Sequence, residues 1–492
     1  MIDDIHPVIK NQLPTLGFLN AAYKGKQAWF EDYPRTTNKN QGIEKVITTQ
    51  KNNSIVDFAL AECFLPLEEL EREAVYRHKY YYRLRRSRWK PLLKETIKVF
   101  CGILSNYIVK EETYSYQADK KEEWLNNIDL IGNNHYSFFS KCDRLALLEG
   151  WCAVWVNSSM VENPPDNFIE QQKLDYRPYL QIIKRSQITD YQIANLSNGE
   201  HFLIKLVYKE TVYEEGQEIE QFVEILIGEV NIYRRDDSDK KKYELFENKK
   251  YDLSYIPIVF YPINNADPFE QEFPLLEIAE DNKVHYQIYS DYRESLHYQS
   301  LPVFVRIGLI RNAGDAEGLS PVTISPYAVV DLPENGDLKI VETSGVAINL
   351  NKEELKEIEA SILSKSLAFL DRSSPMTATE ATLRSVQFKA SFDVFADQKS
   401  SAITEIFKIW ADWRGTQLEG QGITINDSIF KLTSPELIRE FKDLLSQGFL
   451  DLETFWKLLD YWGTLPKGIN IEEVLEKVIG KIREDQTPRD TT

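Results

Sequence analysis

The sequence lacks the short motifs that identify the common catalytic and nucleotide-binding sites. It contains no GxxxxGK[ST] loop that would hold a nucleoside triphosphate, and no GxGxxG, GxSxG or HExxH pattern. Histidine is scarce, and His285 and His297 lie roughly 18 Å apart if one helix carries both, too far to share a metal. We therefore expect no enzymatic activity, no metal site and no cofactor.

Cysteine and long apolar runs are also scarce. The four cysteines show no CxxC spacing, which favours buried thiols in a reducing compartment over a disulfide framework or a zinc site. The most apolar run, Leu147 to Val156, contains Glu149 and is too short to cross a bilayer. The amino terminus is acidic where a signal peptide would be basic and then apolar. We expect a soluble protein that is neither exported nor associated with a membrane.

Acidic residues dominate the charge, with a formal net charge of -19. This balance argues against a protein that coats nucleic acid by neutralising phosphates, but it suits one that lets nucleic acid pass without adhering. A chain of 492 residues is too long for one core, so two to four substructures are expected. The hydrophobic share of 42% is ample for a folded chain.

The stretch from Pro274 to Gly415 has the most regular pattern. Its first segment keeps apolar residues at spacings of three and four without an internal Gly or Pro, which predicts an amphipathic helix of roughly 40 Å. Asn351 with Glu354, and Thr377 with Glu380, have the spacing of capping boxes. The expected elements are a helix over 274–299, β segments over 302–310 and 328–343, a helix over 351–371, a break at 372–376, and a helix over 377–415.

The rest of the chain predicts a mixture of helices and antiparallel strands. Ser434-Pro435-Glu436 has the pattern of a helix start with proline at the first position. The fold class is therefore α+β and predominantly α-helical. The expected elements are helices over 91–109, up to 148, and over 435–447, 451–463 and 471–482, a buried strand over 151–157, and antiparallel strands within 179–261.

Two charged segments are candidates for contact with other molecules. The segment from Tyr76 to Lys90 is basic and aromatic; it suits either nucleic-acid or subunit contact, or an amphipathic helix whose arginines pair with neighbouring acids, and the second interpretation is favoured. Its candidate contact residues are Arg83, Arg85, Arg86 and Arg88. An acidic stretch could bind a divalent cation, although a plain acidic surface is the better interpretation; it contains Asp315, Glu317, Asp331, Glu334 and Asp337.

The order of these elements resembles the portal proteins (head-to-tail connectors) of tailed bacteriophages. The resemblance covers most of the chain from about Phe64 onward, and residues 1–63 match nothing in it. It is carried by YRLRRSRW (82–89), IDLIG (128–132), LLEGWCAVWV (147–156), RPYL (177–180), YIPIVFY (255–261), PLLEIAEDNKVHYQIYSD (274–291), LPVFVRIGL (301–309), LPENGDLKIVETSG (332–345), ATEATLR (378–384) and WADWRG (410–415).

The resemblance implies a subunit of a closed ring, expected to be a dodecamer, at one capsid vertex. Such a subunit is divided into wing, stem, clip and crown. On this chain the implied division is an N-terminal segment of unclear role (1–63), wing (64–273), first stem helix (274–299), clip (300–350), second stem helix (351–371), tunnel loop (372–377), long wing helix and return (378–432) and helical crown (433–492).

The same resemblance implies a channel for DNA packaging and ejection that binds no particular DNA sequence. The expected partners are further copies of the chain, the major capsid protein, the terminase large subunit and the head-tail adaptor protein, in a virion made in the host bacterial cytoplasm. The implied channel-lining residues are Arg372, Ser373, Ser374, Met376 and Thr377. The implied clip contacts with terminase or adaptor are Asp315, Glu317, Asn335 and Asp337.

Two other functions remain open from the residues themselves. One is a metal-dependent nuclease or hydrolase that uses the acidic cluster. The other is a structural scaffold or adaptor without a channel. Against the first, the acidic pair Glu353 and Glu354 has no third ligand at a useful spacing.

Overall fold

A computed structural model describes most of the chain, and its mixture of helices and antiparallel strands confirms the expected mixed α and β composition. The described residues are 2–32, 54–106, 121–158, 177–195, 201–214, 216–235, 242–262, 268–270, 273–299, 303–307, 337–341, 345–367, 395, 397–414, 435–447, 451, 454–456 and 459. They fall into two compact units, of which unit 1 comprises 1–17, 96–274 and 368–492 and unit 2 comprises 18–95 and 275–367.

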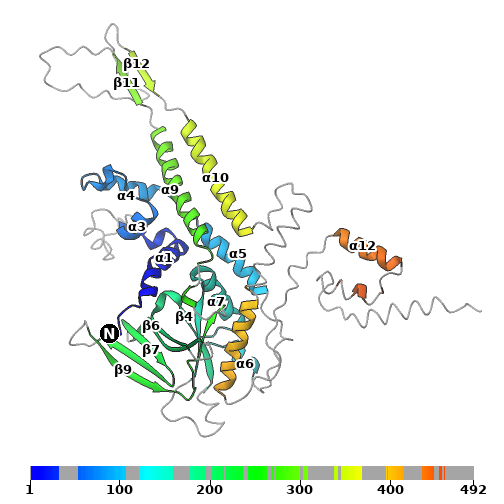
Figure 1. The fold of residues 1–492 in the computed structure, drawn as a ribbon. Coiled ribbons are helices and arrows are strands. Elements are labelled where there is room, and N and C mark those ends of the chain that lie inside the picture. Colours follow the sequence, from blue (N-terminus) through cyan, green and yellow to red (C-terminus); the bar gives the residue numbers. More distant parts are fainter. Residues whose placement is uncertain are drawn as a thin grey trace, which may run out of the picture. The chain divides into compact units, whose positions relative to one another are not determined.

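Two antiparallel sheets form the centre of unit 1 (Figure 1). The three-stranded sheet has the order β10-β3-β4 and contains β3 (Cys152–Ser158), β4 (Pro178–Lys184) and β10 (Ile258–Tyr261). The five-stranded sheet follows the chain in order, as β5 (Ile188–Asn195), β6 (His201–Glu214), β7 (Gln217–Leu226), β8 (Glu229–Arg235) and β9 (Tyr243–Lys250). Gly216, between β6 and β7, and Gly228, between β7 and β8, have the positive φ angle of 80° that these turns need.

Strand β3 is buried along its whole length, which explains its continuous apolar sequence. Because successive side chains of a strand point to opposite faces, Val154 and Val156 enter one core and Ala153 and Trp155 enter another. The first core also contains side chains of α7 (His135–Glu149) and of the helix over 397–412. The second lies between the two sheets and includes residues of β4 to β8.

Helix α7 begins and ends at recognisable signals, and unit 1 contains further helices. In α7, the Asn134 side chain accepts a hydrogen bond from the backbone N–H of Ser137 at 2.8 Å, and Gly150, with φ 88°, follows its last residue. The others are α6 (Lys121–Asn126), α12 (Pro435–Ser446), the first part of α1 (Pro7–Lys24) and most of α5 (Leu92–Asn106), with 3-10 turns at Arg185–Gln187 and Pro268–Glu270.

Unit 2 is built around two antiparallel helices, α9 (Leu276–Gln299) and α10 (Val346–Leu367). The chain between them contains the strand pair β11 (Val303–Ile307) and β12 (Asp337–Val341). Around the helices lie the second part of α1, β1 (Phe30–Asp32), β2 (Ser54–Val56), α3 (Phe58–Phe64), α4 (Arg77–Arg86) and 3-10 turns at Lys26–Ala28 and Leu70–Arg72.

Several sequence predictions are confirmed. The helices predicted at 274–299, 91–109, up to 148 and 435–447 are present as α9, α5, α7 and α12, and the buried strand is β3. The predicted antiparallel strands are present as well, although they form two sheets. The predicted start of the second long helix at Asn351 is wrong. Helix α10 begins at Val346, because the backbone N–H of Asn349 already bonds to the Gly345 carbonyl at 3.1 Å, so Asn351 is an interior residue.

Other predictions remain untested. The helices predicted over 451–463 and 471–482 lie largely or wholly outside the described residues, as does the break at 372–376. The helix predicted over 377–415 is present over 397–412, and residues 377–394 and 396 lie outside the described residues. The compact units divide the chain at residues 17, 95, 274 and 367. The division into wing, stem, clip and crown stays a prediction.

Candidate functional site

The candidate site is the antiparallel pair of α9 and α10 in unit 2, together with the segments that hold it. Three contacts fix its register: Asp281 with Lys365 at 2.8 Å, His285 with Glu359 at 2.9 Å, and Gln299 close to Gly345. As the residue number rises along α9, that of its partner falls along α10. At 1.5 Å per residue, the 24 residues of α9 extend for about 36 Å.

A cluster of charges, here called the helix clamp, joins the middle of the two helices. It consists of Lys90, His285 and Glu359. The Glu359 carboxylate accepts a hydrogen bond from Lys90 Nζ at 2.7 Å and one from Nε2–H of His285 at 2.9 Å. The His285 side chain is 3% exposed, and its Nδ1 has no hydrogen-bond partner among the described residues. Neutral His285 therefore carries its proton on Nε2.

The clamp changes the acid-base properties of both titrating members. Burial lowers the pKa of His285, and the hydrogen bond to Glu359 only partly opposes this. Burial would raise the pKa of Glu359, but the hydrogen bonds from Lys90 and His285 outweigh it and lower that pKa. The arrangement therefore favours a neutral imidazole beside an ionised carboxylate.

A buried asparagine links α9 to the start of α5. Asn282, 0% exposed, accepts a hydrogen bond from the backbone N–H of Leu93 at 3.1 Å and donates one to the Lys90 carbonyl at 2.9 Å. It thereby satisfies backbone groups at a helix start, where N–H donors have no partner within the helix. An asparagine within the apolar stripe of α9 was the signal in the sequence that such a contact exists.

An aromatic cluster fixes the same part of α9 to the amino-terminal segment. Trp29 stacks on Phe64 with ring centroids 4.0 Å apart, and Trp89 meets both rings edge-on. Tyr286 of α9 meets Trp29 and Trp89 at 5.9 and 5.5 Å. Stacked and edge-on ring pairs stabilise a fold by more than the burial of their apolar surface alone. Trp29, which lies in the segment 1–63 for which the sequence suggested no role, thus contributes to the support of the long helix.

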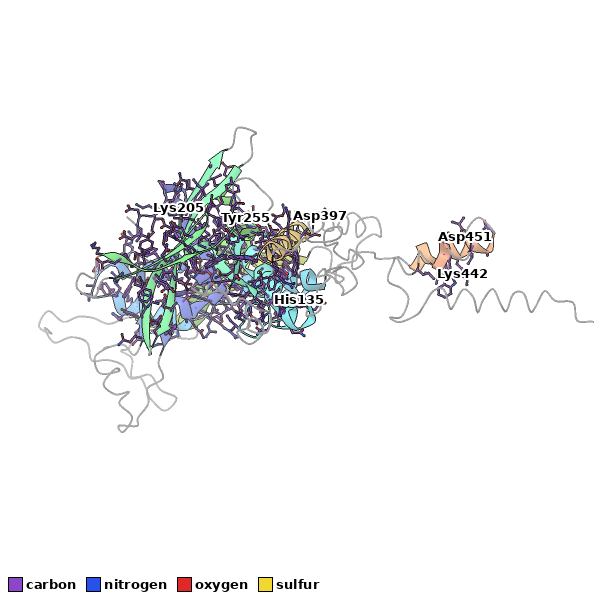
Figure 2. All side chains as sticks on the ribbon, turned by 90° about the horizontal axis from the view of Figure 1, so that it is seen from below. His135, Lys205, Tyr255, Asp397, Lys442 and Asp451 are labelled. Carbon is purple, nitrogen blue, oxygen red and sulfur yellow. The ribbon has the colours of Figure 1, made fainter. Side chains whose placement is uncertain are left out.

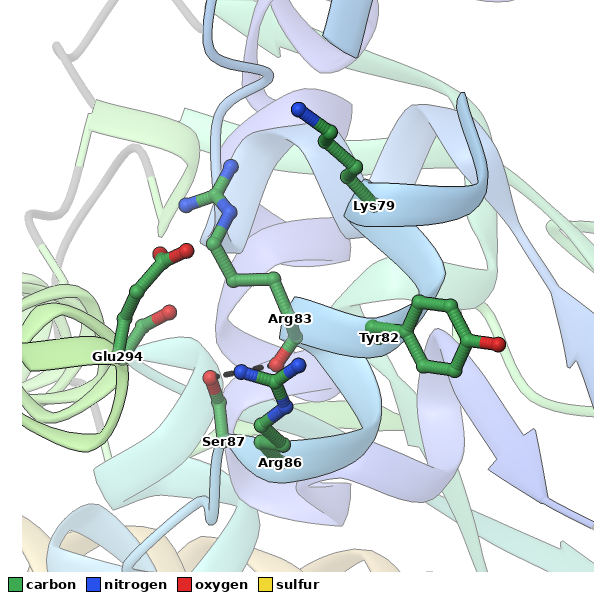
Figure 3. Close-up of a pocket in the computed structure, with 7 residues that line it drawn as sticks. Lys79, Tyr82, Arg83, Arg86, Ser87 and Glu294 are labelled. Atoms are coloured by element: carbon green, nitrogen blue, oxygen red, sulfur yellow. Dashed lines mark hydrogen bonds between the residues drawn. The ribbon is translucent and has the colours of Figure 1, made fainter. Parts of the chain in front are cut away.

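The predicted basic segment forms α4, and its arginines occupy two different environments. Arg83 is 8% exposed and donates two hydrogen bonds to the Glu71 carboxylate, at 2.6 and 3.1 Å, and one to the Pro66 carbonyl. Arg85, Arg86 and Arg88 are exposed. Figure 3 shows Arg86 beside Ser87, with the Glu294 carboxylate of α9 directed toward Arg83. The interpretation as an amphipathic helix paired with acids therefore describes Arg83, and contact with nucleic acid or another subunit stays a prediction for the exposed three.

The other predicted site residues lie mostly outside the described residues. This applies to the predicted channel-lining residues 372–374, 376 and 377 and to Asp315, Glu317 and Asn335 of the predicted clip. Asp337 is the first residue of β12 and pairs with Ile307 of β11. Within the described ranges there is no group of three or more His, Cys, Asp or Glu placed to hold a metal. No described helix has the length and apolarity needed to span a membrane.

Comparison with known proteins finds one family match, which covers the stretch that contains the candidate site. Residues 274–414 match the family described as "Domain of unknown function (DUF4055)", a range that contains both α9 and α10. No curated protein matches the chain.

Two solved structures with similarity to the chain are of particles. A chain of "Neck of empty GTA particle computed with C6 symmetry" is 13% identical, with 76% of this chain and 90% of that chain covered and a TM-score of 0.41. A chain of "Virion of native gene transfer agent (GTA) particle" is 14% identical, with 77% and 92% covered and a TM-score of 0.40.

Proposed function

We propose that the chain is a portal subunit of a tailed bacteriophage, a structural protein without catalytic activity. Copies of it would form a closed ring at one capsid vertex, expected to be a dodecamer, through which double-stranded DNA is packaged and ejected. The ring would contact the major capsid protein and bind the terminase large subunit and then the head-tail adaptor. It would be made in the bacterial cytoplasm and become part of the virion.

The main support for this proposal is the pair of long antiparallel helices, which are joined by a stretch of chain that contains a strand pair. Helices α9 and α10 contain 24 and 22 residues, and β11 and β12 lie in the chain between them. This is the order of stem, clip and stem in the family that the sequence resembles. Asn282 and the aromatic cluster hold one side of α9 in place, which supports a role for this helix in a rigid channel wall.

The solvent-facing side of α9 has the charge that a DNA channel requires. Glu277, Glu280 and Asp291 are exposed and lie on one side of the helix at 100° per residue, and we call them the acidic stripe. Of these, Glu277 also lies 3.6 Å from Lys365 of α10. Negative side chains repel a phosphate backbone along its whole length, so passing DNA meets no strong binding point. The chain's net charge of -19, repeated around a ring, strengthens this repulsion.

Exposed apolar side chains on α10 favour a second copy of the chain as the neighbour. Val346 is 61% exposed and Leu350 is 58% exposed, one turn apart and on the side of the helix away from buried Leu355. Heterologous contacts that close on rotation generate rings, and an apolar patch at such a contact would be covered in each subunit.

Ring formation is tested by light scattering coupled to size-exclusion chromatography, followed by negative-stain imaging. The proposal expects a species of many times 57.3 kDa with a central hole. Leu350→Glu should shift the distribution toward smaller species, because it places a charge in the expected contact. Leu70→Glu is the matched control, since Leu70 is also exposed, at 55%, in unit 2 but lies outside α10.

Three outcomes separate the proposal from its alternatives. A protein that stays a single subunit under all conditions and cleaves DNA when a divalent cation is added would identify a nuclease. A large assembly without a central hole would identify a scaffold or adaptor. Equal effects of Leu350→Glu and Leu70→Glu would contradict the assignment of the α10 surface to the contact.

A further inference from the structure

A small pocket in unit 2 lies between α4 and α9. Its volume is about 90 Å³, and it is lined by Lys79, Tyr82, Arg83, Arg86, Ser87, Ser290 and Glu294 (Figure 3). This space is larger than one water molecule requires. None of its lining residues belongs to the helix clamp or to the acidic stripe, and Asp291 of the stripe follows the lining residue Ser290 in the chain.

The pocket contains a buried hydroxyl that lacks a partner. Ser290 of α9 is 1% exposed, and its Oγ makes no hydrogen bond to any described residue. Ser87, 2% exposed, differs because its hydroxyl donates to the Arg83 carbonyl at 2.8 Å. A buried polar group without a partner is costly, so a molecule in the pocket that accepts a hydrogen bond from the Ser290 hydroxyl would be stabilised there.

The charge around the pocket indicates what that molecule is. Arg83 is neutralised by Glu71 at 2.6 Å, whereas Lys79 and Arg86 have no ion-pair partner among the residues that the structure describes. Glu294 contributes one opposing carboxylate. Among the residues that line the pocket, the two cations without an ion-pair partner outnumber the one carboxylate. Glu68 and Asp291 do not line the pocket, but both interact with Arg83, so the positive excess belongs to the pocket wall alone.

We propose that this pocket binds a small oxyanion of the phosphate class. The Ser290 hydroxyl would donate a hydrogen bond to one oxygen, and Arg86 and Lys79 would supply charge-assisted donors to others. Free phosphate and a phosphate group of nucleic acid share this chemistry. Because Ser290 and Ser87 are buried, a free or terminal phosphate reaches them more readily than a phosphodiester within a duplex does. The inference does not depend on ring formation.

The test is isothermal titration calorimetry of the full-length protein with inorganic phosphate at low ionic strength. We expect one saturable site per chain. Ser290→Ala should weaken binding by about tenfold, because it removes a hydrogen bond to a charged group without changing the charge. Arg86→Gln should weaken it by a similar factor. Arg88→Gln is the matched control: Arg88 is an exposed arginine close to α4 that does not line the pocket, and it should leave the affinity unchanged.

Thermal unfolding of the same variants gives a second measurement. Without phosphate, Ser290→Ala should have an unchanged or higher Tm, because the substitution removes an unsatisfied polar group. Added phosphate should raise the Tm of the wild type and of Arg88→Gln but not that of Ser290→Ala.

A blunt duplex without terminal phosphates distinguishes the two sources of the anion. Binding of this duplex that is weakened by Ser290→Ala would assign the pocket to nucleic-acid backbone, and binding of phosphate alone would assign it to the free anion. The proposal is overturned if neither ligand saturates the site, which would leave water as the occupant. It is also overturned if Ser290→Ala binds as tightly as the wild type, or if Arg88→Gln weakens binding as much as Arg86→Gln.

Discussion

Each compact unit contains a hydrogen-bonded charge cluster that joins three segments, and the two clusters differ mainly in their access to water. In unit 1, Asp143 of α7 accepts hydrogen bonds from Tyr261 of β10 at 2.5 Å and from Lys399 at 2.7 Å, and we call this group the core tie. The side chains of Asp143 and Lys399 are both 0% exposed. In the helix clamp of unit 2, the Lys90 side chain is 44% exposed and that of Glu359 is 37% exposed.

This difference determines how each cluster responds when one member is lost. Water can replace a missing partner in the helix clamp, so its ion pair behaves largely like a surface pair. No water reaches the core tie, so removal of one member leaves an uncompensated charge in a region of low dielectric constant. The core tie therefore fixes the helix over 397–412 against α7, whereas the helix clamp is sensitive to pH.

Loss of the Lys399 charge should have the largest effect. We expect Lys399→Met to lower the free energy of unfolding by about 3–5 kcal/mol, because Asp143 remains buried and charged without its cation. Urea unfolding monitored by tryptophan fluorescence measures this change, since Trp410 lies in the helix and Trp413 in the turn that follows it. The Trp413 indole N–H donates to the Val156 carbonyl at 2.7 Å, so its environment reports on the packing of this helix. Figure 2 labels Asp397 at the start of the helix and Tyr255, which bonds to Asp412 near its end.

Two further variants show whether burial causes this effect. Lys408→Ala removes an exposed ion pair with Glu405 from the same helix and should change stability by less than about 0.5 kcal/mol. The double variant Asp143→Asn with Lys399→Met should recover most of the loss, because no unpaired charge remains. If Lys399→Met cost no more than Lys408→Ala, the distinction between the core tie and an exposed pair would be wrong.

Acid should weaken the helix clamp. The pKa of His285 in the folded protein is lowered from its ordinary 6.5, so at intermediate pH the unfolded chain binds the proton more readily. The stability of unit 2 is then complete above about pH 6.5 and decreases as the pH falls toward the lowered pKa. Glu359, whose pKa is lowered from 4.5, adds a further loss below that pH. Hydrogen exchange in α9 and α10 between pH 7 and pH 5, corrected for intrinsic rates, measures the effect.

The matched control for this pH dependence is the other histidine of α9. His285→Gln should reduce the loss of protection between pH 7 and pH 5, because the titrating group is removed. His297→Gln, which changes an exposed side chain, should retain it. Equal pH dependence in both variants would show that His285 is not the group responsible.

The sequence predicted those elements whose physical causes are local. The periodic apolar residues of α9, the cap and glycine of α7 and the continuous apolar run of β3 all lie within the segment that they determine. The start of α10 was misplaced because Asn351 with Glu354 has the spacing of a capping box in the interior of a helix. A polar pair on the surface of a helix gives the same pattern as a cap.

The site depended on contacts that no local pattern reveals. Lys399 and Asp143 are separated by 256 residues, and Asn282 reaches back 189 residues to Leu93. The amino-terminal segment supports α9 through Trp29, whose ring lies beside Tyr286, and no local pattern in the sequence predicts this contact. The proposed channel-lining residues rest on the family resemblance and remain predictions.

Loss of the outer ion pair between the long helices should have the smallest effect. Lys365 Nζ lies 2.8 Å from Asp281, with side chains 39% and 30% exposed, and its pKa is raised by this hydrogen bond. We expect Lys365→Ala to cost about 0.2–1 kcal/mol at low salt, and the cost should decrease at high salt because exposed pairs are screened. Lys352→Ala, at an exposed position of α10 without a described ion pair, is the control for helix propensity. A cost for Lys365→Ala that approaches that of Lys399→Met and persists at high salt would mean that exposure does not set the strength of these pairs, and the contrast between the two units would fail.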